Sequence, residues 1–375
     1  MGTVKEVPAA RAATVTALVA TLREATGRVD LELAAPPVPL TGGFYAEMLR
    51  FRLADAPPGL EGDLVARIVP DPIAGEWEAT VQRAVAGQGF PTPAVRLSAG
   101  AAGPLGRYLI VMDALDGRSP MSGLGIGAVA TEIPHLLRRL PDQLARLAAD
   151  LHALDPAPLA EALDALDTTV PTTTAGFVEQ QAGVAAALGH RDIAAAGERL
   201  LATEPRSRAL VITHGDLHPF NVIATDAGPA LVDWTVARVA HPGFTLGFAD
   251  LMLANPPIRL PAAGAAVMRR LGRNVAGRFL STYGRLADGT CSAVDADNLD
   301  WHRKVHALRI LVELAGWDAA GTHPAAHHPW LVLEPVACRL LGVGLVGAHT
   351  PRGWVASGAP WRGAPGSTSR RRRGG

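Results

Sequence analysis

Residues 213–221 read THGDLHPFN, and residues 231–234 read LVDW. The first stretch has the spacing H-G-D-x-x-x-x-N, and the second ends an apolar run at an aspartate. Transfer of a phosphoryl group to a hydroxyl requires one carboxylate beside the attacking oxygen, with an amide and a second carboxylate to hold Mg²⁺. We therefore predict that Asp216 is the base and that Asn221 and Asp233 bind the metal, because Mg²⁺ prefers hard oxygen ligands.

The residues around these three side chains predict a local β structure. Short apolar runs at 209–212 and 229–232 lead into the histidine and into the second aspartate, and residues 221–224 form a third run. Between the last two, residues 226–228 (Asp-Ala-Gly) are typical of a turn. This order predicts a loop, a hairpin and a second loop, with polar side chains emerging at strand ends. The alternative is a surface hairpin whose Asp and Asn residues only cap turns.

The pattern resembles the aminoglycoside phosphotransferase superfamily, whose members share the two-lobed fold of protein kinases. The resemblance implies an α+β fold with a small β-rich N-terminal lobe and a larger, mainly helical C-terminal lobe. It implies Mg²⁺ as cofactor, and ATP (or GTP) as co-substrate with a small hydroxyl-bearing acceptor. Trp234 and Thr235 stand where protein kinases have Phe and Gly, which argues against a protein kinase with a flipping activation segment.

The same resemblance assigns supporting roles to two residues near the motif. It implies that His214 braces the catalytic loop by hydrogen bonds without acting as the base. It also implies that Asp250 braces this loop from the start of a helix. The alternative for Asp250 is a carboxylate that only stabilises a helix N-terminus. His218 faces either the substrate or only the solvent, and His152 is interpreted as structural.

Nucleotide contacts are expected in the N-terminal lobe. Gly42 and Gly43 precede an alternating segment, so they are expected in a hairpin turn that covers the phosphates, with an ordinary hairpin as the alternative. Arg67 stands where protein kinases have a phosphate-binding Lys, and a guanidinium also binds phosphate. A solvent-exposed Arg is the alternative. We expect Glu78 to hold Arg67 in place, with Glu76 as the rival.

The apolar run at 108–112 predicts a strand that leads into the hinge between the lobes. The resemblance implies that the backbone of residues 113–115, including Asp113 and Leu115, binds the nucleotide base. Met112 would flank this base, and core packing is the alternative role of its side chain.

The predicted organisation has four parts. Residues 1–30 are a helical extension, 31–115 the nucleotide-binding lobe, 116–348 the catalytic and acceptor-binding lobe, and 349–375 a tail rich in Arg and Gly. The composition of this tail predicts disorder. Helical patterns lie at 8–27, 75–89, 136–154, 160–166, 177–201, 259–286, 298–317 and 330–345.

Composition excludes several classes of function. The formal net charge of the 375 residues is zero, so no overall field attracts nucleic acid or a membrane surface. The apolar stretch at 340–348 is too short to span a bilayer. Cys291 and Cys338 are the only cysteines, which favours reduced thiols in a cytoplasmic protein. The oligomeric state has no signature in the sequence.

The charge of the helical region bears on the acceptor. Polycationic aminoglycosides need an acidic pocket, whereas the helices from 251 to 310 are mainly basic. Their cationic residues are Arg259, Arg269, Arg270, Arg273, Arg278, Arg285, Arg303, Lys304 and Arg309. This favours another hydroxyl compound, such as choline, homoserine, a sugar or a macrolide, although most of these arginines are expected on solvated helix faces. A catalytically silent nucleotide-binding protein is the second alternative. The missing Lys favours it and the complete Asp216, Asn221 and Asp233 set opposes it.

Overall fold

The computed structural model describes residues 6–40, 46–119, 129–205, 209–256, 262–287, 295–322 and 328–346. Gly42, Gly43, Cys291 and the predicted tail from residue 349 lie outside these ranges. The chain divides into two compact units. The first contains Met1–Phe177, Pro205–Pro256 and Leu260–Arg303, and the second contains Val178–Glu204, Pro257–Arg259 and Lys304–Gly375. The predicted lobe boundary between residues 115 and 116 stays a prediction.

The first unit contains a five-stranded antiparallel sheet with the order β1-β2-β3-β5-β4. Its strands are β1 (Val38–Pro39), β2 (Glu47–Phe51), β3 (Leu64–Val69), β4 (Val95–Ala99) and β5 (Tyr108–Asp113). The side chains of β3 are buried on both faces of the sheet, in keeping with its nearly continuous apolar sequence. The register places Arg67 opposite Met48 of β2 and Ile110 of β5.

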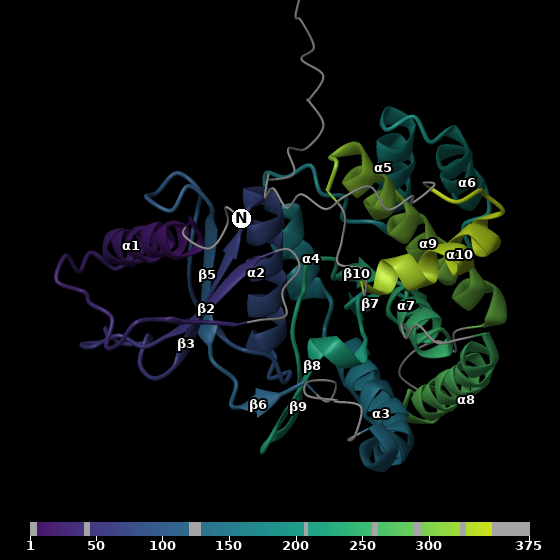
Figure 1. The fold of residues 1–375 in the computed structure, drawn as a ribbon, viewed down its shortest axis with the longest axis horizontal. Coiled ribbons are helices and arrows are strands. Elements are labelled where there is room, and N and C mark those ends of the chain that lie inside the picture. The colour runs from purple at the N-terminus through teal and green to yellow at the C-terminus, as the bar shows by residue number, and fades with distance from the viewer. Residues whose placement is uncertain are drawn as a thin grey trace, which may run out of the picture. The chain divides into compact units, whose positions relative to one another are not determined.

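Two helices cover the two faces of this sheet (Figure 1). Leu18 and Leu22 of α1 (Glu6–Thr26) are fully buried in a cluster with alternate residues of β2, β3 and β5. The other face packs against Ala79 of α2 (Pro72–Gly87). Successive strand residues point to opposite faces, and Val65 and Val69 of β3 belong to the α2 cluster. Arg67, between them in the alternation, therefore lies on the α2 face.

The rest of the first unit carries the motif on short strands between helices. Its elements are β6 (Gly117–Arg118), α3 (Val129–His152), α4 (Ala157–Asp164), β7 (Val211–Thr213), the 3-10 turn η1 (Pro219–Asn221), β8 (Val222–Thr225), β9 (Gly228–Leu231), β10 (Arg238–Ala240), α7 (Gly243–Ala254), α8 (Ala262–Leu286) and the first part of α9 (Ala296–Ala319). The predicted hairpin is confirmed, since β8 pairs with β9, and β6 joins it through β8. β7 instead pairs with β10.

One apolar core joins α2 to the elements that carry the motif. Trp77 of α2 is buried in a cluster with Leu144 of α3, Leu217, Trp234 and Phe279 of α8. Apolar and polar residues alternate along the motif. Leu217 points into this core, whereas its neighbour Asp216 does not. The segment that carries the motif therefore rests on a packed scaffold.

The second unit is helical in the part that the structure describes. It contains most of α5 (Thr174–Ala187), α6 (Arg191–Ala202), the end of α9 and α10 (Pro329–Leu341). The helical pattern predicted at 177–201 is two helices, because Gly189 adopts a φ of 86° and ends the first one. Gly197 of α6 lies against Ala182 of α5, where a side chain would overlap.

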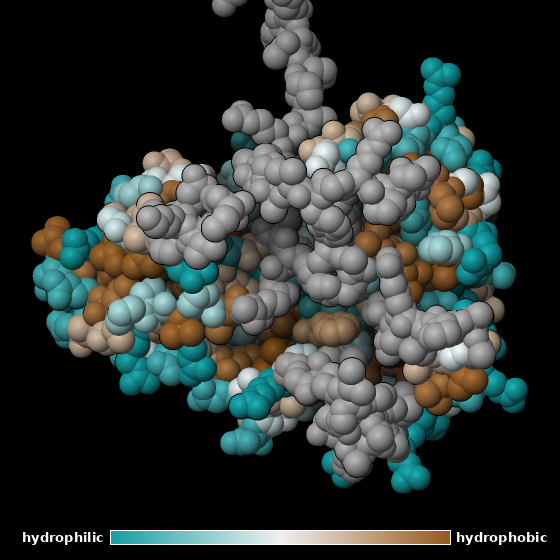
Figure 2. Space-filling view, in the orientation of Figure 1, coloured by the Kyte–Doolittle hydropathy of each residue, from teal (hydrophilic) through white to brown (hydrophobic). Residues whose placement is uncertain are grey.

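The surface mixes hydrophilic and hydrophobic residues among the described ones (Figure 2). Within the described residues, the helices are too short or too polar to cross a membrane.

Candidate active site

The predicted catalytic loop starts where β7 ends. All three residues of β7 are buried, and the Thr213 hydroxyl donates to the carbonyl of Arg238 on the neighbouring β10 (2.8 Å). The next amide, that of His214, donates to the hydroxyl of Thr245 in α7 (3.0 Å). The hydroxyl oxygen of Thr245 therefore ties the first residue of the loop to helix α7.

His214 is a buried, uncharged brace, as predicted. Its Nε2 lies 3.1 Å from the carbonyl oxygen of Val232, and its Nδ1 accepts the amide N–H of Asp216 (3.2 Å). Because a carbonyl only accepts, Nε2 carries the proton. Burial lowers the pKa of His214 to about 4, so the ring stays neutral near pH 7. It connects the segment before Asp233 to the loop that carries Asp216.

Gly215 allows the loop to turn between these two residues. Its φ of 69° lies in the left-handed region, which side chains other than glycine rarely occupy. A Cβ atom there would lie 2.4 Å from Cε1 of Phe244. Both the backbone angle and the space therefore require glycine at this position.

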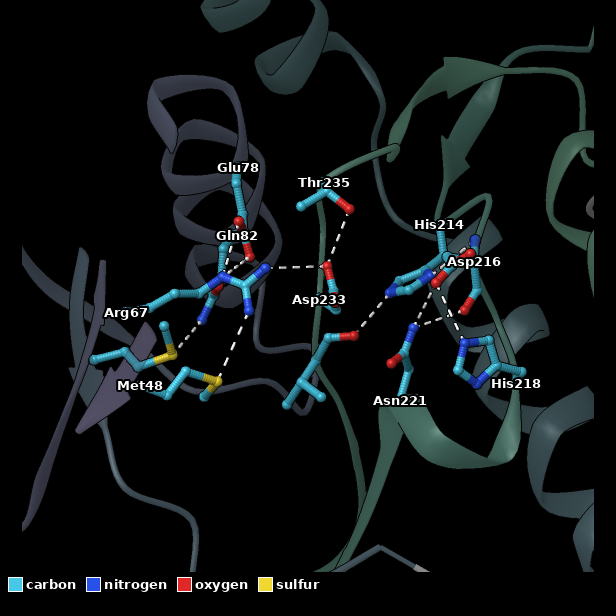
Figure 3. Close-up of polar contacts among 12 residues, drawn as sticks. Met48, Arg67, Glu78, Gln82, His214, Asp216, His218, Asn221, Asp233 and Thr235 are labelled. Carbon is cyan, nitrogen blue, oxygen red and sulfur yellow. Dashed lines mark hydrogen bonds and ion pairs between the residues drawn. The ribbon is translucent and has the colours of Figure 1, made fainter. Parts of the chain in front are cut away.

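Asp216 and Asn221 contact each other directly (Figure 3). Nδ2 of Asn221 donates to Oδ2 of Asp216 (2.9 Å) and to its main-chain oxygen (3.0 Å). Both amide hydrogens of Asn221 are thereby used, which directs its carbonyl oxygen away from Asp216. The backbone of Asn221 also accepts the N–H of Val232 (2.9 Å), so the loop and the end of the hairpin are held together.

The donor set suits a magnesium ion. The outward oxygen of Asn221 and the carboxylate of Asp233 are hard ligands, and Mg²⁺ typically adds waters and substrate phosphates to one or two protein ligands. Asp233 has a φ of 70°, and its Oδ1 accepts the Thr235 hydroxyl (3.0 Å). Backbone strain of this kind is common at functional sites. The residues that the sequence predicts as metal ligands therefore fit the group.

Arg67 links the sheet to Asp233. Its Nε lies 2.9 Å and 3.0 Å from the two carboxylate oxygens of Glu78, and its Nη2 lies 3.3 Å from Oδ1 of Asp233. The choice of Glu78 over Glu76 as the partner is confirmed, and the alternative of a solvent-exposed Arg67 is wrong, because its side chain is 7 % exposed. Arg67 thus stands between a structural carboxylate and a predicted metal ligand (Figure 3).

The environment of Glu78 perturbs its ionisation. The pKa of Glu78 is raised to about 7. Burial is the main cause, the negative charge of Asp233 acts in the same direction, and the positive charge of Arg67 opposes both. Such a shift is typical of functional clusters. The ion pair with Arg67 therefore depends on pH near neutrality.

Two tryptophans link the segment after Asp233 to helix α2 and to the loop that follows this helix. Nε1 of Trp77 in α2 donates to the carbonyl of Ala237 (2.9 Å). Trp234, which is fully buried, donates to the hydroxyl of Thr92 (3.0 Å). These contacts keep Glu78, one residue after Trp77, beside Arg67.

Asp250 does not have the predicted role. It lies in the second half of α7, and its carboxylate pairs with Arg303 of α9 (2.6 Å). The expectation that it braces the catalytic loop from a helix start is wrong, as is the alternative of a helix N-terminal carboxylate. Thr245, in the first turn of α7, supplies the brace instead.

The predicted base-binding residues lie at the end of β5. The Met112 side chain is buried in the α2 cluster, and its sulfur lies 3.5 Å from Nε2 of Gln82. The Asp113 carboxylate pairs with Arg96 (2.7 Å). Leu115 follows β5 in the segment that leads to β6. Core packing of Met112 is confirmed, and the contacts of all three with a nucleotide stay predictions.

Several arginines of the basic helices are paired with carboxylates. Arg278 of α8 pairs with Asp142 of α3, and Arg303 pairs with Asp250. In the second unit, Arg309 pairs with Glu313 (3.0 Å). Because these arginines form ion pairs on the helices, their charges are partly neutralised. They are therefore weaker evidence against a cationic acceptor than the sequence alone suggested.

Comparison with known proteins identifies the family of the chain. The phosphotransferase enzyme family model matches residues 39–288. A search of curated protein sequences found no match.

Three solved structures illustrate the similarity of the fold. A protein of Ralstonia eutropha JMP134, described as a candidate aminoglycoside phosphotransferase, is 18 % identical, with a TM-score of 0.59 over 87 % of this chain and 95 % of its own. A choline/ethanolamine kinase family protein of Mesorhizobium loti is 18 % identical, with a TM-score of 0.52 over 88 % and 98 %.

The third is a thermostable mutant of aminoglycoside phosphotransferase APH(4)-Ia in a ternary complex with AMP-PNP and hygromycin B. It is 15 % identical, with a TM-score of 0.54 over 89 % of this chain and 100 % of its own. The predicted α+β, protein-kinase-like fold is thereby confirmed. The match of the family model to most of the sequence shows that the chain belongs to the phosphotransferase enzyme family.

Proposed function

We propose that this protein is a Mg²⁺-dependent kinase that transfers the γ-phosphate of ATP (or GTP) to a hydroxyl group of a small molecule. The observation that carries the proposal is the double hydrogen bond from Asn221 to Asp216. It fixes a carboxylate that could accept the proton of a hydroxyl, and it leaves the amide oxygen of Asn221 as a ligand that could hold Mg²⁺. Asp233 and Arg67 then complete the set that phosphoryl transfer needs.

The reaction follows from this arrangement. The acceptor hydroxyl approaches Asp216, which orients the oxygen and takes its proton as the bond to the γ-phosphorus forms. The bond from this phosphorus to the bridging oxygen breaks, and the nucleoside diphosphate leaves. Arg67, held by Glu78, neutralises charge on the phosphates. Bound Mg²⁺, held by Asn221 and Asp233, would stabilise the negative charge of the phosphate oxygens.

The acceptor class is proposed from the charge of the helical region. The helices from 251 to 310 carry more cationic than anionic residues. Asp142 and Asp250 are already paired with Arg278 and Arg303, which leaves fewer carboxylates for the ammonium groups of an aminoglycoside. We propose a less cationic hydroxyl compound, such as homoserine, a sugar or a macrolide, or the single cation choline.

The test is Mg²⁺-dependent consumption of ATP and GTP with a panel of these acceptors and with aminoglycosides. Turnover that one compound stimulates is expected to fall by at least about a thousandfold in Asp216→Ala, with nucleotide binding nearly unchanged. Asp233→Ala is the control for metal dependence. Turnover at the wild-type level in Asp216→Ala would sink the assignment, and nucleotide binding with no turnover for any acceptor would favour a silent protein.

A further inference from the structure

His218 lies beside the proposed base. Its Nε2 lies 3.3 Å from Oδ2 of Asp216, and the two side chains are 12 % and 13 % exposed (Figure 3). The imidazole ring packs against Phe220 and Phe248, with centroid distances of 5.7 Å and 6.0 Å. The ring is therefore held in place from two sides and does not extend into solvent.

The backbone selects one tautomer of this ring. Nδ1 of His218 accepts the amide N–H of Phe220 (3.2 Å), which caps the 3-10 turn that leads to Asn221. A ring nitrogen that accepts a hydrogen bond carries no proton, so the proton of the neutral ring is on Nε2. That N–H is the group beside Asp216.

Two nitrogen donors thus approach the same carboxylate oxygen. Nδ2 of Asn221 lies 2.9 Å from Oδ2 of Asp216, and Nε2 of His218 lies 3.3 Å from it. The rotation of an aspartate carboxylate about its Cβ–Cγ bond is otherwise broadly distributed. Two donors on one oxygen restrict this rotation, which sets the direction in which the carboxylate meets a hydroxyl.

We propose that His218 is a positioning residue for the transfer, which donates its Nε2 proton to Oδ2 of Asp216 and orients that carboxylate toward the acceptor hydroxyl. The inference rests on the proposed function. His218 keeps its proton throughout, and the proton of the acceptor goes to Asp216. The separation of 3.3 Å between Nε2 of His218 and Oδ2 of Asp216 is long for a hydrogen bond. Catalytic hydrogen bonds are often long in structures without substrate and shorten in the reactive complex, and we expect the same here.

Three substitutions separate this role from the capping of the turn. His218→Gln places an amide N–H at the position of Nε2 and loses the cap. His218→Asn keeps an oxygen that caps the turn, since Asn is a favoured N-cap, but does not reach Asp216. His218→Ala loses both.

Turnover is measured as MgATP consumption, with water as acceptor and with the compound that stimulates it most. We expect kcat to fall about tenfold or more in His218→Ala and His218→Asn, and KM for MgATP to change less than about threefold. His218→Gln is expected to recover most of the rate. Recovery by Asn with loss in Gln would overturn the proposal, because it would show that capping alone matters.

A spectroscopic measurement tests the tautomer independently of turnover. Long-range ¹H–¹⁵N spectra of histidine-labelled protein, with His218 assigned from its loss in His218→Gln, are expected to show a neutral ring protonated at Nε2. The Nε2 resonance is expected to shift in Asp216→Ala. A ring protonated at Nδ1 would overturn the proposal.

These results also distinguish the two levels of inference. Wild-type turnover that does not depend on Asp216 would overturn the proposed function, and with it the role of His218. Turnover that depends on Asp216 but is equal in His218→Asn and His218→Gln would overturn only the role of His218.

Discussion

Glu78 and Asp216 are two carboxylates of one site, and they are held in opposite ways. Glu78 is 1 % exposed and faces a guanidinium, whereas the Asp216 side chain is 13 % exposed and has an amide and an imidazole as neighbours. The first is enclosed by its partner and by α2. The second lies on a loop between β7 and η1, where it is partly exposed and where we propose that an acceptor reaches it.

This difference follows from what each carboxylate has to do. A group that only holds a cation can be enclosed with its partner, because no other molecule has to reach it, although burial disfavours its charged form. A group that receives a proton has to be accessible, and its orientation has to be set by groups that do not occupy the position of the acceptor. The geometry of the two partners therefore indicates the role of each acid.

The largest effect is expected from the loop that carries Asp216. Gly215→Ala would place a Cβ 2.4 Å from the Phe244 ring at a φ of 69°, so the loop has to shift. We expect kcat to fall about a hundredfold, since a displacement of about 1 Å has this cost.

Gly228→Ala is the matched control for this change. Gly228 also has a positive φ, of 121°, but open space around it. We expect this variant to lose stability in a thermal melt while its turnover stays near the wild-type value. Equal loss of turnover in both variants would show that strain in the hairpin, and not the position of the loop, controls the rate.

A smaller effect is expected on the side of Glu78. Glu78→Gln keeps the shape but removes the charge that holds Arg67, so KM for MgATP is expected to rise about tenfold with a smaller change in kcat. Because the pKa of Glu78 is raised to about 7, the wild-type KM is expected to rise as the pH falls below about 7. The variant controls for titration of the nucleotide itself, and the same pH dependence in both proteins would exclude Glu78 as its cause.

The smallest effect concerns the stability of the fold in acid. Burial raises the pKa of a carboxyl group and lowers the pKa of a histidine. Burial lowers the pKa of His152 to about 3, and of His214 and His302 to about 4. Below their usual pKa of about 6.5 the unfolded chain binds more protons than the folded one, so stability falls as the pH drops from about 6.5 to about 4. Glu78 acts in the other direction, because its raised pKa makes the folded state bind the proton first.

His302→Asn tests this assignment. Nδ1 of His302 lies 2.7 Å from the carbonyl of Asn298, and the Asn amide is able to donate there without titrating. We expect the midpoint of thermal unfolding to depend less on pH by a few degrees between about pH 6.5 and 4. An unchanged pH dependence would assign the acid sensitivity to other groups.

The sequence was sufficient for the parts of the site that depend on local spacing. The loop around Asp216, the hairpin before Asp233 and the pair of Arg67 with Glu78 all follow from short patterns of strand, turn and helix. Each of these patterns places its side chains through the regular geometry of one or two elements.

The contacts that sequence reasoning missed join residues far apart in the chain. Trp77 and Ala237, His214 and Thr245, and Asp250 and Arg303 are single side-chain contacts between elements. No periodicity encodes such a contact, because it depends on how the elements pack. For the same reason, the sequence does not decide whether His218 faces the substrate or the solvent. Its neighbours Phe248 and Asp216 lie on α7 and on the loop, and only the packing of these two elements brings them together.

The helix that covers the outer face of the sheet has a consequence for how far the chain can be shortened. The family pattern begins at residue 39, after α1, yet Leu49, Phe51 and Ile68 are almost fully buried in the cluster that contains Leu18 and Leu22. Removal of α1 would bring these apolar side chains into contact with water. A chain cut back to the matched residues would therefore expose an adhesive apolar face.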